Sequence, residues 1–254
     1  MAELKKNTLS INRIDTVVYT GGTGEPLLFL HGTGTFHGFE FAKDWADKFH
    51  VIHPHHPGFG ESGDAPAMDT FHDYVMHYVE MLDILGVDKV HAVGFSLGGF
   101  LAAHFASEHP ERVKTLSLVA PAGMRSKEHP MLDVLMASSE QIVESMAFDF
   151  EVLKPWLPTG PDPDFLGARY REAASMARLL WEKPWDQKFL RYLHRITMPT
   201  LIVWGQEDKI IPFQHADLWK AKLPNAKVKV FKNAGHLVLD EKREAADAVA
   251  AFAA

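Results

Sequence analysis

A serine between two glycines is the first group in this 254-residue chain whose type and setting could do chemistry. The pentapeptide Gly94-Phe95-Ser96-Leu97-Gly98 follows an apolar, β-branched run over 90–93 and precedes a helix-forming run over 100–106. A strand that turns directly into a helix strains the residue at the turn, and the flanking glycines leave room for it. Such a turn raises the hydroxyl of Ser96 above the sheet and places the positive end of the helix near any oxyanion that forms. The pattern predicts a nucleophile elbow.

A serine hydroxyl is a weak nucleophile at neutral pH and needs an adjacent base that a third group orients. Two later stretches supply these groups where predicted strands end. Glu207 and Asp208 follow the strand expected over 200–204, and His236 follows the strand expected over 227–231. The carboxyl ends of parallel strands line one crevice, so residues far apart in the sequence can meet there.

Strands that alternate with helices must position these groups. The expected strands are 8–14 and 16–20 (joined by a tight turn near Asp15), 26–30, 51–52, 90–93, 113–119, 200–204 and 227–231. The expected helices of the core are 39–48, 70–85, 100–106, 213–223 and 245–252. This alternation predicts an α/β fold with a mostly parallel sheet covered by helices on both faces.

Residues 121–195 interrupt the alternation, and we call them the cap segment. They are rich in proline and in bulky apolar residues and contain no convincing parallel strand. Helical patterns run over 131–148, 164–180 and 185–194. We expect a helical insertion that folds over the sheet as a cap, with a core domain formed by 1–120 and 196–254.

Composition excludes several classes of function. The net charge is −7, from 33 acidic and 26 basic residues, with no basic run dense enough for nucleic acid. The absence of cysteine excludes disulfides, thiolate metal sites and a cysteine nucleophile. Neither a signal peptide nor a membrane-spanning run is present in the sequence, so we expect no membrane association and a cytoplasmic location. A homodimer is left open.

The chain has 15 histidines, of which His50, His53, His55 and His56 cluster. Prolines flank the paired His55 and His56, and no helical pair of ligands with a carboxylate stands beside them. We therefore expect no bound metal.

Five motifs together resemble the α/β-hydrolase fold superfamily, in its branch of small, capped, cofactor-free enzymes. They are HGTGT at 31–35, PGFGES at 57–62, GFSLGG at 94–99, WGQEDKIIP at 204–212 and NAGH at 233–236. The resemblance implies an eight-stranded sheet and no cofactor. It implies a Ser96-His236-Asp208 triad, with Asp208 rather than Glu207 as the acid.

The resemblance also assigns an oxyanion hole to the backbone N–H groups of Thr33 and Leu97, with Gly34 in place of Thr33 if the loop register differs by one. Two positions depart from the pattern. His55 stands where many relatives carry aspartate, which predicts local repacking. Leu237 and the residues after it lack the tryptophan that C–C bond hydrolases of this fold often carry behind the histidine.

We expect a serine hydrolase that cleaves carboxylic esters or lactones of small to medium apolar or aromatic substrates through an acyl-enzyme. The same residues could serve a C–C bond hydrolase, an enol-lactonase, a perhydrolase or an acyltransferase. A ligand-binding, receptor-like protein with slow or no turnover is the alternative outside catalysis. Three cap arginines, Arg125, Arg169 and Arg178, could meet a substrate carboxylate, but solvated helix faces are the favoured interpretation.

Overall fold

The computed structural model describes residues 3–37, 39–181, 186 and 188–254. Within these residues, eight strands form one sheet in the order β1-β2-β4-β3-β5-β6-β7-β8. The strands are β1 (Lys5–Ile11), β2 (Ile14–Gly21), β3 (Glu25–Leu30), β4 (Phe49–Pro54), β5 (Val90–Phe95), β6 (Val113–Val119), β7 (Thr200–Gly205) and β8 (Lys227–Phe231). The β1–β2 and β2–β4 pairs are antiparallel and the remaining pairs are parallel. The expected eight-stranded, mostly parallel α/β sheet is confirmed.

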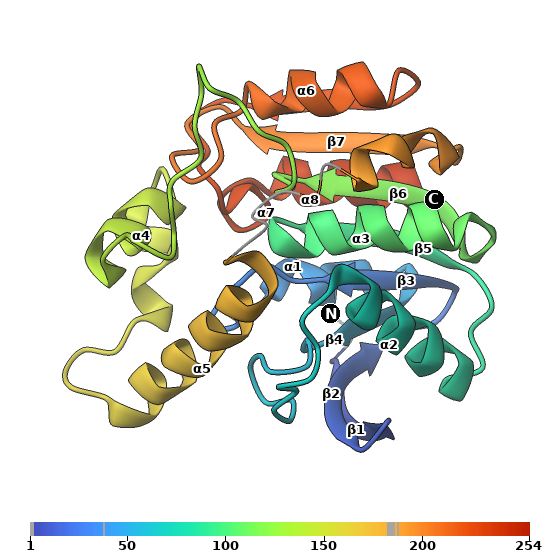
Figure 1. Ribbon diagram of the computed structural model, residues 1–254, viewed down its shortest axis with the longest axis horizontal. Helices are drawn as coiled ribbons and strands as arrows, with labels where there is room; N and C mark the ends of the chain where they lie inside the picture. Colours follow the sequence, from blue (N-terminus) through green and yellow to red (C-terminus); the bar gives the residue numbers. More distant parts are fainter. Residues whose placement is uncertain (1–2, 38, 182–185, 187) are drawn as a thin grey trace.

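Helices cover both faces of the sheet. In Figure 1, α2 (Phe71–Ile84) and α3 (Leu97–Glu108) lie in front of it, and α1 (Glu40–Trp45) and α8 (Arg243–Ala253) lie behind. Helix α6 (His215–Lys222) packs along β7 and β8, and the short α7 (Val238–Glu241) precedes α8. Among the helices of the described residues, none has the length and apolar character that crossing a membrane requires.

The central strands are apolar throughout because both of their faces are covered. Every residue of β5 and β7 is buried, including Val93 and Val203. Continuous apolar runs of this kind are typical of parallel strands between two helical layers. Apolar packing on both faces of the sheet therefore holds the central strands in place, and with them the strand ends from which the polar loops start.

Two local predictions were wrong. The turn of the first hairpin lies at Asn12 and Arg13, not near Asp15, because both residues adopt positive φ (50° and 67°) and the pairing of Ile11 with Ile14 closes a two-residue loop. The helix expected over 131–148 forms only as α4 (Ser139–Met146). It begins where Ser138 accepts the N–H of Gln141 in a capping box.

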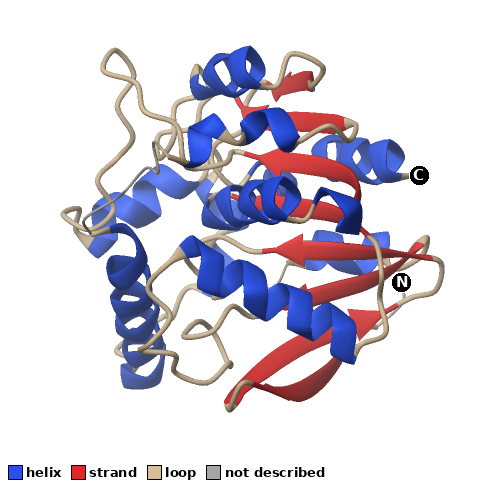
Figure 2. Cartoon of the chain, turned by 45° about the vertical axis from the view of Figure 1, so that its right-hand side comes forward, coloured by secondary structure: helices blue, strands red, loops and turns tan. Residues whose placement is uncertain are grey.

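The cap segment contains α4, α5 (Pro163–Leu180) and four short 3₁₀ helices in its described part: η2 (Phe150–Val152), η3 (Lys154–Trp156), η4 (Phe189–Arg191) and η5 (Leu193–Arg195). A further 3₁₀ turn, η1 (Pro110–Arg112), lies in the core. The helix expected over 185–194 falls partly outside the described residues, and its described part forms η4 and η5. Figures 1 and 2 show α4 and α5 on the side toward which the arrows of the parallel strands point. That the segment is a separate cap domain stays a prediction.

Candidate active site

Ser96 sits at a strained turn between β5 and α3. Its backbone angles, φ 55° and ψ −117°, lie outside the ordinary regions for an L-residue. Its N–H donates to the carbonyl of Val119 at 2.9 Å, and its own carbonyl accepts the N–H groups of Gly99, Phe100 and Ala122. A Cβ at Gly98 would lie 2.1 Å from the carbonyl oxygen of Leu30, so glycine is required there. These contacts hold the strained turn in place.

Three side chains from different strand ends meet at this turn. The Nε2 atom of His236 lies 2.9 Å from Oγ of Ser96, and its Nδ1 lies 2.7 Å from Oδ2 of Asp208. All three residues are buried, with exposed fractions of 7% for Ser96, 4% for His236 and 6% for Asp208. Because Nδ1 faces a carboxylate, it carries the ring proton and leaves Nε2 free to accept the serine hydroxyl proton. The arrangement can activate an alcohol as a nucleophile.

The carboxylate of Asp208 is surrounded by N–H donors. Its Oδ1 accepts the backbone N–H groups of Ile210 at 2.9 Å and Ile211 at 2.8 Å, and its Oδ2 accepts the indole N–H of Trp204 at 3.1 Å. Together with His236, these donors satisfy the buried negative charge. Glu207 points elsewhere and accepts the N–H of Ala234 at 3.0 Å. The structure thus places Asp208, and not Glu207, against the imidazole.

The loop expected to supply oxyanion contacts lies beside Ser96. A Cβ at Gly32 would approach Cβ of Ser96 to 3.2 Å, so the backbone before Thr33 touches the candidate nucleophile. Within the described part of the chain, the N–H groups of Thr33, Gly34 and Leu97 donate to no acceptor. Leu97 is also the first residue of α3, where helix geometry leaves N–H groups unpaired. These N–H groups are available to a ligand.

Histidines from two loops pack together beneath this site. Rings of His31 and His56 stack at 3.7 Å between centroids, Nε2 of His31 accepts the N–H of His56, and Nε2–H of His56 donates to the carbonyl of His31. His55 accepts the N–H of Glu61 within the PGFGES loop at 3.0 Å. That the loop repacks around this histidine relative to proteins with aspartate there stays a prediction. Across the described residues, no group of three or more side chains is arranged to hold a metal ion.

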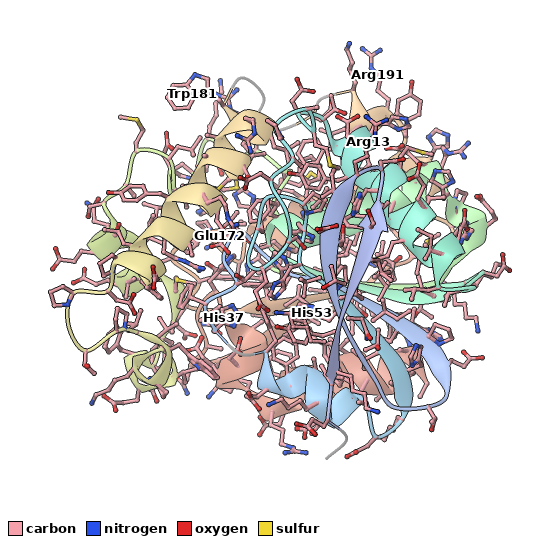
Figure 3. The ribbon with its side chains drawn as sticks, turned by 90° about the horizontal axis from the view of Figure 1, so that it is seen from below. Arg13, His37, His53, Glu172, Trp181 and Arg191 are labelled. Carbon is pink, nitrogen blue, oxygen red and sulfur yellow. The ribbon has the colours of Figure 1, made fainter. Side chains whose placement is uncertain are left out.

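A buried carboxylate that the sequence analysis did not single out connects the cap segment to this loop. Glu172 of α5 is 2% exposed, and its Oε1 accepts the Oγ1–H of Thr35 at 2.6 Å and the N–H of Gly60 at 3.0 Å. Its Oε2 lies 2.9 Å from Nη1 of Arg169. Burial raises the pKa of Glu172, and Arg169, Thr35 and Gly60 oppose that shift. Figure 3 shows Glu172 on the side of α5 that faces the core.

Arg169 is therefore not on a solvated helix face, which corrects the favoured interpretation of the cap arginines. Its guanidinium lies 5.2 Å from the ring centroid of Phe36 and 5.3 Å from that of Phe165. Arg178 is exposed and donates to Oγ of Ser175. The one sequence signal for Glu172 was its place in the buried stripe of α5 with Ser175, Met176 and Leu179, at helical spacing.

A further carboxylate that the sequence analysis did not single out is Glu241, five residues after His236 at the end of α7. It accepts the N–H of Gly235 at 2.6 Å and two N–H groups of the cap segment. On the same short helix, Oδ1 of Asp240 lies 3.6 Å from Nδ1 of the buried His37, which Figure 3 labels near His53. Neither Glu172 nor Glu241 stands in a sequence motif, because the partners of each lie in loops that only folding brings close.

The site is covered. A cavity of about 640 Å³ opens elsewhere, among α2, α3 and the 3₁₀ helices of 189–195, and its described lining includes none of Ser96, Asp208 and His236. Trp181, at the end of α5, is 68% exposed and points away from the core in Figure 3. Ser96 itself is 7% exposed, so little of its surface is open to solvent.

Comparison with known proteins places this chain in a family. The family model of the alpha/beta hydrolase fold matches residues 25–243. The chain is 28% identical to Lipase 3 of Moraxella sp. (strain TA144), over 94% of this chain and 81% of the lipase. It is 29% identical to 2-hydroxy-6-oxo-6-phenylhexa-2,4-dienoate hydrolase of Burkholderia cepacia, over 85% of this chain and 82% of that enzyme. A serine hydrolase from the polyaromatic hydrocarbon-degrading bacterium Cycloclasticus zankles has the same fold, with a TM-score of 0.80 at 22% identity over 98% of this chain and 97% of that one. The chain belongs to the α/β-hydrolase fold family.

Proposed function

We propose that this hydrolase cleaves carboxylic esters or lactones with Ser96 as nucleophile, His236 as general base and acid, and Asp208 as the group that orients His236. The observation that carries the proposal is the continuous hydrogen-bonded line from Asp208 through both ring nitrogens of His236 to Oγ of Ser96, at 2.7 and 2.9 Å. Nucleophile and base are within hydrogen-bond reach, and a third group holds the base.

The chemistry follows in balanced steps. The Oγ of Ser96 attacks the acyl carbon while its proton passes to Nε2 of His236, and the tetrahedral oxyanion accepts the N–H groups of Thr33 and Leu97. The alcohol leaves with the proton from His236, and an acyl-enzyme remains. Water then gives a proton to His236 and attacks the ester carbon, and Ser96 regains its proton as the acid departs. Each oxyanion donor contributes about 3 kcal/mol to the transition state.

The lipase relative supports ester chemistry, since Lipase 3 is matched over nearly the whole of this chain. The apolar composition of the cap segment, which is rich in methionine and tryptophan, supports small to medium apolar or aromatic substrates. An apolar substrate pocket would discriminate weakly between substrates that differ by one methylene group, by about 1–3 kcal/mol for each methylene.

Cleavage of a C–C bond is the second candidate, because the Burkholderia cepacia hydrolase is as similar to this chain as the lipase is. Two observations weigh against it. Leu237 and the residues after it contain no tryptophan. The half-buried Arg169 is already paired with Glu172, which reduces its availability to a substrate carboxylate.

Labelling and turnover test the proposal together. The protein is incubated with a fluorophosphonate and digested for mass spectrometry, and p-nitrophenyl acetate and butyrate are assayed beside the dienoate substrate named for the Burkholderia cepacia relative. We expect one adduct, on Ser96, and release of p-nitrophenol that Ser96→Ala abolishes. Turnover of the dienoate alone would favour the C–C hydrolase. Tight ligand binding with neither adduct nor turnover would favour a receptor-like protein.

A further inference from the structure

The carboxylate of Glu241 joins two segments that are far apart in the sequence. Its Oε2 accepts the N–H of Gly235, the residue before His236, at 2.6 Å. Its Oε1 accepts the N–H groups of Phe148 at 2.7 Å and Asp149 at 2.9 Å, directly after α4 in the cap segment. Three backbone donors from two segments therefore depend on one side chain.

The main chains of the two segments also touch. The N–H of Leu237 donates to the carbonyl of Met146 at 3.0 Å. A Cβ at Gly235 would lie 2.6 Å from the nitrogen of Phe148 and 2.8 Å from the carbonyl carbon of Ala147, so only glycine permits this approach. Residues 233–236, which we call the histidine loop, and the end of α4 thus form one hydrogen-bonded unit.

The opposite side of the histidine loop is held by the core. Glu207 donates its N–H to the carbonyl of Ala234 at 2.9 Å and accepts the N–H of Ala234 at 3.0 Å through its carboxylate. The loop is therefore clamped from two directions, by Glu207 from the end of β7 and by Glu241 together with the cap segment. Of these two carboxylates, Glu241 is the one that makes the position of the loop depend on the cap segment.

We propose that Glu241 is a positioning residue that fixes the histidine loop to the docked cap segment and so holds the imidazole of His236 between Asp208 and Ser96. This inference rests on the proposed function, because it gives His236 the role of base. Hydrogen bonds to a carboxylate are stronger than neutral ones, and three of them converge here. A displacement of about 1 Å at a reacting group lowers rates by about a hundredfold, so a small shift of the loop has a large effect.

The first test is Glu241→Gln, which keeps the size of the side chain. The amide offers an oxygen to one set of N–H groups and an NH₂ group to the other, so it cannot serve both. We expect kcat for p-nitrophenyl butyrate to fall by about tenfold to a hundredfold with little change in KM. We also expect faster hydrogen exchange at the amides of 235, 148 and 149 together. Glu244→Gln is the matched control, because Glu244 is an exposed carboxylate in the first turn of α8.

A second pair of variants leaves the carboxylate intact in case Glu241→Gln folds poorly. Phe148→Pro removes one cap-side N–H, and Ala147 already has the extended angles, φ −127° and ψ 150°, that precede proline. Phe148→Ala controls for the lost ring. We expect a fall in kcat for the proline variant only. Wild-type kcat in both Glu241→Gln and Phe148→Pro would overturn the proposal. A lower kcat in Glu241→Gln with unchanged hydrogen exchange at the amides of 235, 148 and 149 would also overturn it.

A readout without substrate separates this proposal from the proposed function. We expect the proton between Nδ1 of His236 and Oδ2 of Asp208, which lie 2.7 Å apart, to give a low-field ¹H NMR resonance in the free protein. We expect Glu241→Gln to shift or broaden that resonance while Glu244→Gln leaves it in place. If the wild-type protein neither labels nor turns over, the proposed function fails, and this resonance still tests the positioning role. An unchanged resonance in Glu241→Gln would refute that role even in an active enzyme.

Discussion

Two adjacent carboxylates, Glu207 and Asp208, have different environments although they follow the same strand. Asp208 is buried and receives N–H groups from Ile210, Ile211 and Trp204 in addition to the imidazole. Those donors and the imidazole satisfy both carboxylate oxygens, so the side chain is held in one orientation against His236. Glu207 contacts only the backbone of the histidine loop among the described residues. At this scale, burial and donors distinguish two similar groups.

The first prediction compares these two acids. Asp208→Asn should lower kcat for p-nitrophenyl butyrate by about a thousandfold to ten-thousandfold, because the amide cannot hold Nδ1 of His236 as the donor. Glu207→Gln should lower kcat far less, since it alters a contact to the main chain and not to the imidazole. Steady-state kinetics on both purified variants measure the difference. Equal losses would mean that the acid has been assigned to the wrong residue.

Helix α5 connects the cap segment to the core through several hydrogen bonds made by polar residues on its buried face. Ser175 donates to the carbonyl of Gly58 at 3.0 Å, and Arg171 donates to the carbonyl of Gly60. Glu172 accepts hydrogen bonds from Thr35 and Gly60, so α5 contacts both the loop of residues 31–35 and the PGFGES loop of residues 57–62. At the scale of elements, these contacts fix the orientation of α5 more specifically than its apolar residues do, because hydrogen bonds require particular partners.

The second prediction uses the buried ion pair of this helix. Glu172→Leu should lower the free energy of unfolding by about 3 kcal/mol, because Arg169 would be left half-buried without its partner. The double variant Glu172→Leu/Arg169→Leu should recover part of that loss, since no unpaired charge remains. Urea denaturation of the wild type, both single variants and the double variant completes the cycle. Strictly additive losses would show that the two side chains are not coupled.

Seven histidines with low pKa values are distributed through the molecule. Burial lowers the pKa of His55 to about 4, of His56 to about 3 and of His77 to about 4. Burial likewise lowers the pKa values of four more imidazoles: His31, His53, His104 and His215. In the unfolded chain each histidine titrates near 6.5, so below that pH the unfolded state binds more protons than the folded state. The contribution of these histidines to the free energy of unfolding is therefore fully present above about pH 6.5 and decreases as the pH falls toward 4.

The third prediction removes one of these groups. Each buried neutral histidine contributes up to about 1.4 kcal/mol per pH unit to the loss of stability in acid. His53→Phe should reduce the dependence of the unfolding free energy on pH between pH 6.5 and 5, because it removes one histidine whose pKa burial lowers. A phenylalanine ring suits the site, since His53 stacks on Phe29 at 5.0 Å between ring centroids and its Nε2 has no partner among the described residues. Urea denaturation at several pH values measures the slope. The exposed His194 provides the control as His194→Asn, and equal slopes in all three proteins would contradict the prediction.

Much of the fold followed from local patterns in the sequence. The strands Val113–Val119 and Lys227–Phe231 were predicted with the bounds that the structure has, because buried or paired strands have clear turn residues on both sides. Ser96, the pair Glu207 and Asp208, and His236 could be proposed because each follows a strand, and strand ends in a parallel sheet share one edge. The family resemblance then selected Asp208 within the pair. The helix predicted over 131–148 was too long, since apolar residues that pack irregularly also occur at helical spacing.

Other features depended on tertiary structure alone. The sequence by itself determined the sheet, its alternation with helices and which stretches follow the strand ends, because these depend on neighbours along the chain. It did not determine Glu172 or Glu241, because the partners of both, such as Gly60 and Phe148, are distant in the sequence and are mostly backbone N–H groups, which every residue except proline carries. Only the tertiary structure determines which backbone donors reach a given carboxylate. Through Glu172 and Glu241, these contacts attach the cap segment to the PGFGES loop and to the histidine loop.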